Sequence, residues 1–474
     1  MKHQHSLVWL RRDLRLEDNT AISKACSESS EVTVVFVFDT QILGKLKSKM
    51  DHRLTFIHDS VLEIDNQLKA LGSSLIVLVG DPAEEIPKFA NTLKVNALYF
   101  NMDYEPYAKS RDKKVRESLK ANNINCYEFK DHVIFSGSEI VKADGSPYKM
   151  FTPYKNSWLK AIKTPDFAIR PVDKKRLESK KALSLAQPIP SLKDLGFERT
   201  KLEPAFQAGR ARAVECLKQW TLHLDNYEST RNFPSLDHGT SGLSVHLRFG
   251  TVSVRECVSL AMSRSSSGSQ TWLSELIWRD FYQMILDQFP HVAKGAFKKE
   301  YDQIKWLGTE ANFKAWRDGR TGFPIVDAGM RQLNQTGWMH NRLRMITASF
   351  LVKDLLVDWQ KGESYFAEKL IDFDLAANNG GWQWCASTGC DAQPYFRIFN
   401  PVLQSQKFDP DATFIKKWVP ELKNLSPKEI HQLSDVKKDG KSKSIKSTTG
   451  YPEPIVNHQE QKRRAMKMYN TIAK

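Results

Sequence analysis

The run V-T-V-V-F-V-F at residues 32–38 consists of β-branched and aromatic side chains, which favour extended strands. Between two later runs of this kind, D-P-A-E at 81–84 is a typical helix start. Similar short runs, separated by stretches with helical periodicity, lie at Leu7–Leu10, Leu75–Val79, Ala97–Phe100 and Cys126–Phe129. Alternating strands and helices indicate stacked βα units, so residues 1–131 are predicted to form an α/β domain around a doubly wound parallel sheet.

A different organisation follows this domain. Residues 132–204 form a basic, proline-punctuated stretch that we interpret as an interdomain linker. Helical periodicity then continues over residues 205–474, interrupted by S-S-S-G-S at 265–269, which is expected to form a flexible surface loop. The predicted fold class is therefore an N-terminal α/β domain followed by an all-helical C-terminal domain.

The charge of the chain points to a polyanionic partner. The 474 residues carry a formal net charge of +15, with a pI of about 9.3, which favours nucleic acid. Residues 272–400 hold 15 Lys or Arg and 15 Asp or Glu, whereas residues 401–474 hold 15 and 8, a net charge of +7. Attraction to a polyanion is therefore expected to come partly from the linker and the C-terminal tail.

Composition also excludes several classes of protein. No run approaches the roughly 18 consecutive apolar residues of a membrane span, and Arg11, Arg12 and Asp13 interrupt the apolar start before any cleavage site. The six cysteines form no C-x-x-C pair and no zinc-spaced cluster, so neither a disulfide frame nor a metal site is expected. The sheet domain lacks the G-x-G-x-x-G and G-x-x-x-x-G-K-[ST] phosphate cradles. We expect a cytoplasmic protein.

Chemically unusual side chains gather within residues 272–400. Glu275 and Trp278 are three residues apart on one face of a predicted helix, and a carboxylate beside an indole is costly to bury unless it is paired. Nine of the twelve tryptophans lie after residue 271, which a helical core rich in large side chains would also explain. The hydroxyl-rich segment T-S-G-L-S at 240–244 is either a phosphate-binding helix start or a plain N-cap.

Two further segments favour a cofactor pocket. In W-M-H-N-R-L-R-M at 338–345, Asn341 and Met345 share a helix face, and two arginines lie nearby. The segment D-F-D-L-A-A-N-N-G-G-W-Q-W at 372–384 places two carboxylates and two amides beside a double glycine and two tryptophans. Two carboxylates are too few for a metal site of hard oxygen ligands, so we interpret these groups as partners of a cofactor's hydroxyls and ring nitrogens.

These segments resemble the motifs of the DNA photolyase/cryptochrome family, and most closely those of its bacterial class I cyclobutane-pyrimidine-dimer photolyases. The resemblance extends over nearly the whole chain. It is carried by L-V-W-L-R-R-D-L-R-L-E-D-N-T at 7–20, W-L-S-E-L-I-W-R-D-F-Y at 272–282, G-W-M-H-N-R-L-R-M at 337–345 and D-L-A-A-N-N-G-G-W-Q-W at 374–384.

The resemblance implies a folded FAD in the helical domain, working in its fully reduced form. Asn378 would face flavin N5, where a neutral amide suits a reduced anionic flavin. Trp382, Trp359 and Trp306 match a chain of electron carriers that leads from the flavin to the surface. The positions that match flavin-contacting residues are Tyr227, Thr240, Ser241, Leu243, Ser244, Trp272, Arg279, Asn341, Arg344, Asp372, Asp374 and Asn378.

The implied reaction is light-driven repair of cyclobutane pyrimidine dimers in UV-damaged DNA, by electron transfer from the excited flavin to a dimer flipped out of the duplex. Trp278 and Trp384 would stack on the dimer, and backbone contacts should make the affinity salt-dependent. Catalytic roles are implied for Glu275, Asn341, Met345 and Asn378. The positions matching lesion or DNA contacts are Arg231, Glu275, Trp278, Asn341, Arg342, Met345, Trp384, Gln404 and Lys407. We expect a monomer.

Two alternatives stay open. A (6-4) photolyase resembles W-I-H-H-L-A-R-H where this chain has residues 338–345, so Asn341 and Met345 stand where that chemistry needs histidines for proton transfer. A cryptochrome, which is a light-signalling flavoprotein, would not need the lesion-contacting residues that this chain retains. Both are less favoured than dimer repair.

The sheet domain departs from relatives that carry a folate antenna. Those relatives show Asn-Glu after a Tyr-Glu-Val run, whereas Tyr104, Glu105 and Pro106 are followed here by Tyr-Ala. Ala293 also stands in place of a cysteine on the pterin side, next to Lys294. A second chromophore, either methenyltetrahydrofolate or another pigment, is therefore left as an open question.

Overall fold

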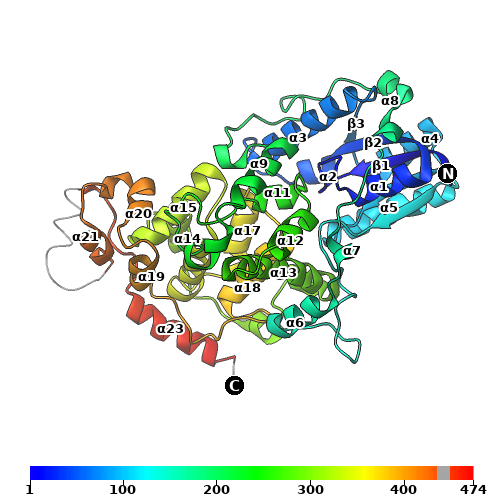
Figure 1. The fold of residues 1–474 in the computed structure, drawn as a ribbon. Coiled ribbons are helices and arrows are strands. Elements are labelled where there is room, and N and C mark those ends of the chain that lie inside the picture. The colour runs from blue at the N-terminus through cyan, green and yellow to red at the C-terminus, as the bar shows by residue number, and fades with distance from the viewer. Residues whose placement is uncertain (435–448, 473–474) are drawn as a thin grey trace. The chain divides into compact units, whose positions relative to one another are not determined.

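Figure 1 shows the fold as a computed structural model, in which residues 1–434 and 449–472 are described. The chain divides into two compact units, and each is built from separate stretches of sequence. Unit 1 comprises residues 1–225 and 241–288, and unit 2 comprises residues 226–240 and 289–474.

Unit 1 contains a five-stranded, all-parallel sheet with the strand order β3-β2-β1-β4-β5. Val8 of the central strand pairs with Val34 on one side and with Tyr99 on the other. The strands are β1 (His3–Leu10), β2 (Ser29–Asp39), β3 (Ile76–Gly80), β4 (Ala97–Asn101) and β5 (Asn125–Phe129). The predicted strands and the doubly wound parallel sheet are confirmed.

Helices cover both faces of this sheet. They are α1 (Thr20–Glu28), α2 (Thr40–Leu43), α3 (His52–Lys69), α4 (Pro82–Leu93) and α5 (Pro106–Ala121). On one face, Ile86 of α4 and Val115 of α5 pack in the same core as Trp9 of β1, whereas α1 contacts β1, β2 and β4 outside that core. The predicted start of α4 is confirmed, because Asp81 Oδ1 accepts a hydrogen bond from Ala83 N at 2.9 Å.

The other helices of unit 1 follow the sheet in sequence. They are α6 (Phe151–Ala161), α7 (Thr164–Phe167), α8 (Lys180–Leu185), α9 (Arg210–Trp220), α11 (Ser244–Phe249), α12 (Val254–Met262) and α13 (Ser267–Gln288), with 3₁₀ turns at Lys174–Leu177 and Pro204–Phe206. The prediction of a surface loop at 265–269 is wrong beyond Ser266, because α13 begins at Ser267 and its residues Gly268 and Ser269 are buried. A Cβ on Gly268 would lie 2.3 Å from the carbonyl oxygen of Leu224, so this small residue serves close packing of backbones.

The described residues of unit 2 form helices joined by loops, without a strand. Its helices are α10 (Tyr227–Thr230), α14 (Glu310–Arg317), α15 (Pro324–Thr336), α16 (Asn341–Ser349), α17 (Trp359–Lys369), α18 (Leu375–Ala386), α19 (Pro401–Phe408), α20 (Thr413–Trp418), α21 (Pro427–Gln432) and α23 (His458–Asn470). The π-helical segment η6 (Phe350–Asp354) directly continues α16. Short 3₁₀ turns lie at Pro290–Ala293, Lys299–Gln303 and Pro420–Leu422. The expected all-helical character of the C-terminal part is confirmed over these residues.

Three absences concern residues 1–434 and 449–472 only. Every helix there is too short or too polar to span a bilayer. The same residues contain no group of three or more His, Cys, Asp or Glu side chains placed to hold a metal ion. The six cysteines, all within this part, are free thiols.

Candidate functional site

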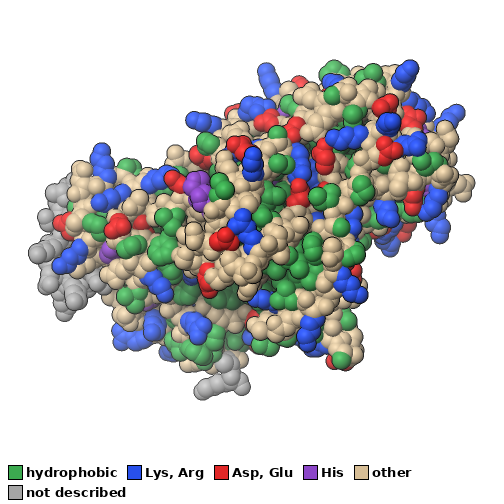
Figure 2. All heavy atoms as spheres, in the orientation of Figure 1, with side chains coloured by type: hydrophobic (Ala, Val, Ile, Leu, Met, Phe, Trp, Pro, Cys, Tyr) green, Lys and Arg blue, Asp and Glu red, His purple; other side chains and the backbone are tan. Residues whose placement is uncertain are grey.

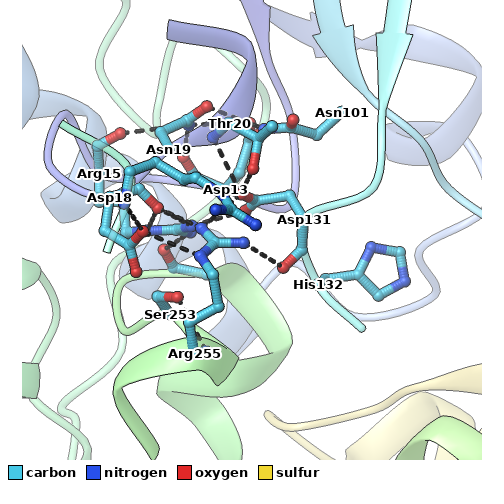
Figure 3. A network of polar contacts seen from close by, with 12 residues as sticks. Asp13, Arg15, Asp18, Asn19, Thr20, Asn101, Asp131, His132, Ser253 and Arg255 are labelled. Carbon is cyan, nitrogen blue, oxygen red and sulfur yellow. Dashed lines mark hydrogen bonds and ion pairs between the residues drawn. The ribbon is translucent and has the colours of Figure 1, made fainter. Parts of the chain in front are cut away.

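The carboxyl ends of β1 and β5 hold a buried group of four charged residues (Figure 3). This charge cluster consists of Arg15, Asp18, Asp131 and Arg255, each with a side chain at most 3% exposed. Asp131 accepts from Arg15 Nη2 at 2.5 Å and from Arg255 Nη2 at 2.8 Å, while Arg255 Nε donates to Asp18 Oδ1 at 2.8 Å. In doubly wound sheets this edge commonly binds a ligand, and here the charge cluster occupies part of it.

Both carboxylate oxygens of Asp131 are hydrogen-bonded within the charge cluster and by Thr20. Burial by itself raises the pKa of Asp131, but Arg15 and Arg255 outweigh burial and hold that pKa well below its ordinary range. Thr20 adds donors to Asp131 Oδ1, from its backbone N at 3.0 Å and its hydroxyl at 2.8 Å. Because Arg255 belongs to α12, the cluster connects that helix to the sheet and is a structural feature rather than a ligand site.

Helix α13 carries the predicted site residues of the W-L-S-E-L-I-W-R motif, namely Trp272, Glu275, Trp278 and Arg279. Trp272 is buried against Trp220, with the ring centroids 5.9 Å apart. Arg279 donates to the carbonyl oxygens of His132 and, at 3.3 Å, of Leu247. The predicted helix is confirmed, and its Glu275 and Trp278 lie on one face as expected. The residues of this motif belong to unit 1.

Trp278 is held face to face by a side chain that the sequence did not single out. The ring centroids of Trp278 and Phe151 are 3.7 Å apart with their planes 7° from parallel, and Tyr282 lies 5.3 Å away. Lys155 Nζ donates to Ser274 Oγ at 2.7 Å and fastens α6 to the same helix. Phe151 was missed because one aromatic residue in a basic, proline-rich stretch carries no periodic signal.

The hydroxyl run at 240–244 is divided between the units, with Thr240 in unit 2 and the rest in unit 1. Helix α11 begins at Ser244 as expected, but the residue at the cap is Leu243, without a side-chain hydrogen bond. Ser241 Oγ accepts only a long contact from Leu243 N at 3.4 Å. The plain N-cap explanation is therefore wrong, while flavin contact by this run stays a prediction.

In unit 2 the structure brings Arg344 and Asp372 together. Arg344 Nη2 donates to both carboxylate oxygens of Asp372, at 2.7 and 3.0 Å, and its Nε donates to the carbonyl oxygen of Met339 at 2.8 Å. The side chain of Arg344 is 26% exposed and that of Asp372 only 3%. Asp374 caps α18 by accepting from Ala377 N at 3.2 Å. A guanidinium that is paired on one side and exposed on the other can also meet a polar ligand.

Asn378 is oriented by a carboxyl group on the neighbouring helix α17. Its Nδ2 donates to Glu363 Oε1 at 2.9 Å and to the backbone oxygen of Glu363 at 3.1 Å. Burial raises the pKa of Glu363, and the hydrogen bond from Asn378 offsets only part of that rise. Since Nδ2 is committed, Oδ1 is the atom of Asn378 left to accept a hydrogen bond. Glu363 was missed because nothing in its local sequence marks it as the partner of an amide 15 residues away.

Helix α16 presents Asn341 and Met345 on one face, as predicted, with Nδ2 and Sδ 4.0 Å apart. Next to them, Arg342 Nη2 donates to Asn232 Oδ1 at 2.7 Å. Burial and the positive charge of Arg231 both lower the pKa of Arg342. An anionic group such as a DNA phosphate would offset this repulsion between two predicted DNA-contacting residues.

The three predicted electron carriers belong to one hydrophobic core of unit 2. Trp382 and Trp359 are buried in it, with 2% and 4% exposure, and Trp306 packs against it. Gly362 of α17 makes room for Trp382, because a Cβ there would lie 2.2 Å from the indole. The indole of Trp316, which the sequence did not single out, lies 6.0 Å from that of Trp382. Electron transfer along these residues stays a prediction.

The remaining predicted residues of unit 2 lie on α10, α18 and α19 or next to them. The guanidinium of Arg231 is 5.2 Å from the ring centroid of Tyr227. Trp384 lies on α18, and Gln404 and Lys407 lie within one turn of each other on α19. Their contacts with flavin or DNA stay predictions.

The expected antenna region of the sheet domain is occupied by internal contacts. Glu105 pairs with Arg12 at 3.3 Å and with Arg248 at 3.4 Å. The hydroxyl of Tyr107 donates to Asp39 Oδ2 at 2.7 Å. These contacts identify no chromophore, so the presence of a second pigment stays open.

Two family models match the chain. The model described as DNA photolyase matches residues 6–173, and the model described as FAD binding domain of DNA photolyase matches residues 272–471. The chain is also 39% identical to the deoxyribodipyrimidine photo-lyase of Synechococcus sp., over 98% of this chain and 96% of that protein.

Solved structures agree with this match. A bacterial class III photolyase from Agrobacterium tumefaciens superposes with a TM-score of 0.89 at 32% identity, covering 100% of this chain and 98% of its own. An archaeal photolyase from Sulfolobus tokodaii, solved with two FAD molecules, gives a TM-score of 0.82 at 36% identity, covering 99% and 100%. The parallel sheet and the helical FAD-binding region define a flavoprotein. The chain belongs to the DNA photolyase family.

Proposed function

We propose that this chain is a deoxyribodipyrimidine photo-lyase, a cytoplasmic monomer that repairs cyclobutane pyrimidine dimers in UV-damaged DNA with FAD and light. One observation carries the proposal. Asn378 and Trp382 lie one turn apart on α18, and both face α17, where Asn378 meets Glu363 and Trp382 meets Gly362. The amide proposed for flavin N5 and the first proposed electron donor are therefore presented by one face of one helix.

The residues of unit 2 suit a flavin. Bound FAD, once reduced, would supply an electron to the dimer after absorbing light and take it back when the cyclobutane ring has opened. Arg344 and Asp372 offer a charged pair for polar groups of the cofactor, and Asn378 Oδ1 offers an acceptor for a protonated ring nitrogen. The unit 1 residues included in the proposal are Ser241, Leu243, Ser244, Trp272 and Arg279.

We propose separate roles for the lesion-contacting residues. Trp278, Trp384 and Met345 would pack against the flipped dimer, since aromatic and thioether groups stack well on bases. Glu275 and Asn341 would hydrogen-bond its carbonyl groups, with Glu275 able to supply a proton. The side chains proposed to hold the DNA backbone are Arg231, Arg342, Gln404 and Lys407.

A repair assay tests this proposal. A UV-irradiated duplex is incubated with the purified flavin-loaded protein, in blue light and in darkness, and dimers are counted. We expect dimers to disappear only in the light. Repair in darkness, or a protein without flavin, would contradict the proposal. Flavin that photoreduces without any repair would instead support the cryptochrome alternative.

A substitution tests the electron path. Trp382→Phe should abolish photoreduction of the oxidised flavin, while repair by chemically pre-reduced protein survives, because phenylalanine is much harder to oxidise than tryptophan. Trp418→Phe, at a partly buried tryptophan elsewhere in unit 2, is the control and should photoreduce normally. Loss of both activities in Trp382→Phe would show that the residue has another role.

A further inference from the structure

Helix α23 has two chemically different sides. Gln461, Ala465, Met468 and Tyr469 are buried, whereas the exposed side carries Lys462, Arg463, Arg464 and Lys467, here called the basic face. Figure 2 shows Lys and Arg side chains over the region where α23 lies in Figure 1. The one acidic residue of the helix, Glu460, lies in its first turn. Four cations thus project from six consecutive positions without an interleaved anion.

Local ion pairs do not neutralise the basic face. Within residues 1–434 and 449–472, none of its four side chains pairs with a carboxylate. Arg464 Nη1 reaches only Gln461 Oε1 at 3.3 Å, and Arg463 Nε only the backbone oxygen of Gln459 at 3.4 Å. By contrast, the exposed Lys314 pairs with Asp318 in the same unit. The positive charge of the basic face is therefore available to an anion, and an open hollow lies along it.

Both ends of α23 are anchored to unit 2. Near its start, His458 Nδ1 lies 2.5 Å from Asp354 Oδ1 of the π-helical segment η6. Near its end, the Tyr469 hydroxyl donates to the carbonyl oxygen of Ala386 at 2.7 Å, and Lys353 Nζ lies 3.6 Å from the Tyr469 ring centroid. These buried contacts hold the basic face in one position, which favours binding because no ordering of the helix is required.

The anchor point lies on the same helix as a proposed lesion-contacting residue. Ala386 is the last residue of α18, and Trp384 precedes it by two positions on the same helix. A duplex carries one phosphate charge per ~1.7 Å of its axis, so a lesion held at Trp384 has a dense row of phosphates on either side. Helix α23 has 13 residues and is ~20 Å long, which matches about six base pairs of duplex.

From these contacts we infer that Lys462, Arg463, Arg464 and Lys467 bind the phosphates of the duplex that flanks the lesion. The inference rests on the proposed function, since it takes damaged DNA as the substrate. It adds a second, sequence-independent contact surface to the one proposed for Arg231, Arg342, Gln404 and Lys407. A duplex is favoured over an anionic membrane because the apolar side of α23 is buried in the protein and leaves no face to insert into a bilayer.

A salt titration of DNA binding tests the inference. The quadruple variant K462Q/R463Q/R464Q/K467Q is compared with K24Q/K88Q/K114Q/K120Q, which removes the same charge from exposed lysines of unit 1 that pair with no carboxylate of the described residues. Dissociation constants for damaged and undamaged duplex are measured over a range of NaCl concentrations. We expect the slope of log affinity against log salt to fall by about 1 for each lost phosphate contact in the α23 variant only. Its affinity should fall by similar factors for both duplexes.

Each other outcome has a defined meaning. An α23 variant with the slope of the unit 1 control overturns the inference, as does loss of binding to phosphatidylserine vesicles with unchanged DNA binding. If the quadruple variant does not fold by circular dichroism, the single variants Arg463→Gln and Lys467→Gln replace it, each with an expected slope change of about 1. A wild-type protein that fails to repair dimers in light contradicts the proposed function. Normal repair with a control-like slope contradicts only the role of α23.

Discussion

The two units bury arginine–carboxylate pairs in opposite ways. In the charge cluster of unit 1, Asp131 is held by two arginines and by Thr20, and no side chain is more than 3% exposed. In unit 2, Asp372 has one arginine, and that side chain, Arg344, is 26% exposed. Among the described residues, Glu363 in unit 2 has an amide for a partner and no cation. A buried carboxylate whose oxygens are all paired inside the protein stabilises the fold, whereas a charge pair with one partly exposed partner can still bind a ligand.

The pKa values follow the same division. Arginines hold the pKa of Asp131 below its ordinary range despite burial, whereas burial raises the pKa of Glu363 and the hydrogen bond from Asn378 offsets only part of that rise. The carboxyl group of unit 1 is thus committed to its charged form. The carboxyl group of Glu363 in unit 2 accepts a hydrogen bond from Asn378, and this contact fixes the orientation of the amide.

The largest effect, a loss of stability, is expected from breaking the charge cluster of unit 1. Asp131→Asn removes the negative charge between two buried arginines and should lower the free energy of unfolding by about 3–5 kcal/mol at neutral pH. Because the folded pKa of Asp131 is depressed, the wild-type stabilisation is fully present above the unfolded pKa and is lost progressively as pH falls from there toward the folded pKa. Urea unfolding from pH 3 to 8 measures the destabilisation at neutral pH and the beginning of this decline. Arg199→Gln, at an exposed ion pair, is the control and should change stability by less than ~1 kcal/mol. A similar small change in Asp131→Asn would show that the cluster is dispensable.

Breaking the incomplete pair should weaken FAD binding as well as lower stability, because Asp372 is itself only 3% exposed. Arg344→Met leaves Asp372 without its cation and should weaken FAD binding by about 10- to 100-fold, the equivalent of one or two charge-assisted hydrogen bonds. Flavin fluorescence during dialysis gives the dissociation constant. Arg397→Met, at an exposed arginine of unit 2, should keep wild-type affinity. Equal affinity in both variants would remove Arg344 from the proposed flavin site.

A smaller effect is expected at the stacked pair in unit 1, where a proposed lesion-contacting residue is packed like a core residue. Phe151→Ala removes the face-to-face partner of Trp278 and should reduce the preference for damaged over undamaged duplex by about fivefold, or ~1 kcal/mol. Phe151→Tyr, which keeps the ring, should retain the preference. The yield of repair per bound dimer should not change. Unchanged preference in Phe151→Ala, with a clear loss in Trp278→Ala, would show that Trp278 needs no support.

The smallest effect concerns Glu363 and appears only as a function of pH. Because its folded pKa is raised, the unfolded chain ionises first as pH rises, and wild-type stability declines through that range. Glu363→Gln cannot ionise but keeps an acceptor for Asn378, so it should be more stable than wild type at neutral pH and equal to it in acid. Unfolding curves from pH 4 to 8 in the flavin-free protein measure this difference. Identical pH profiles of the wild type and Glu363→Gln would show that folding does not raise the pKa of Glu363.

Local patterns predicted much of the fold and part of the site. The five strands, the start of α4 at Asp81 and the shared face of Asn341 and Met345 depend on short-range periodicity and capping, and all are observed. The loop expected at 265–269 is wrong because Ser and Gly favour loops locally, whereas here they allow close packing. Glu363 and Phe151 were missed because their roles depend on partners from other elements.

The sequence by itself determined the α/β and helical parts and the family to which the chain belongs, since periodic apolar residues and ordered motifs are properties of neighbouring positions. Only the tertiary structure decided which charged side chains are fully paired and buried and which remain accessible to a ligand. Arg15 meets Asp131 across 116 residues and Asp18 meets Arg255 across 237, whereas Arg344 meets Asp372 across 28 and remains partly exposed. Such pairings depend on the path of the chain, because electrostatic energy is set by distance and burial in space and not by separation in sequence.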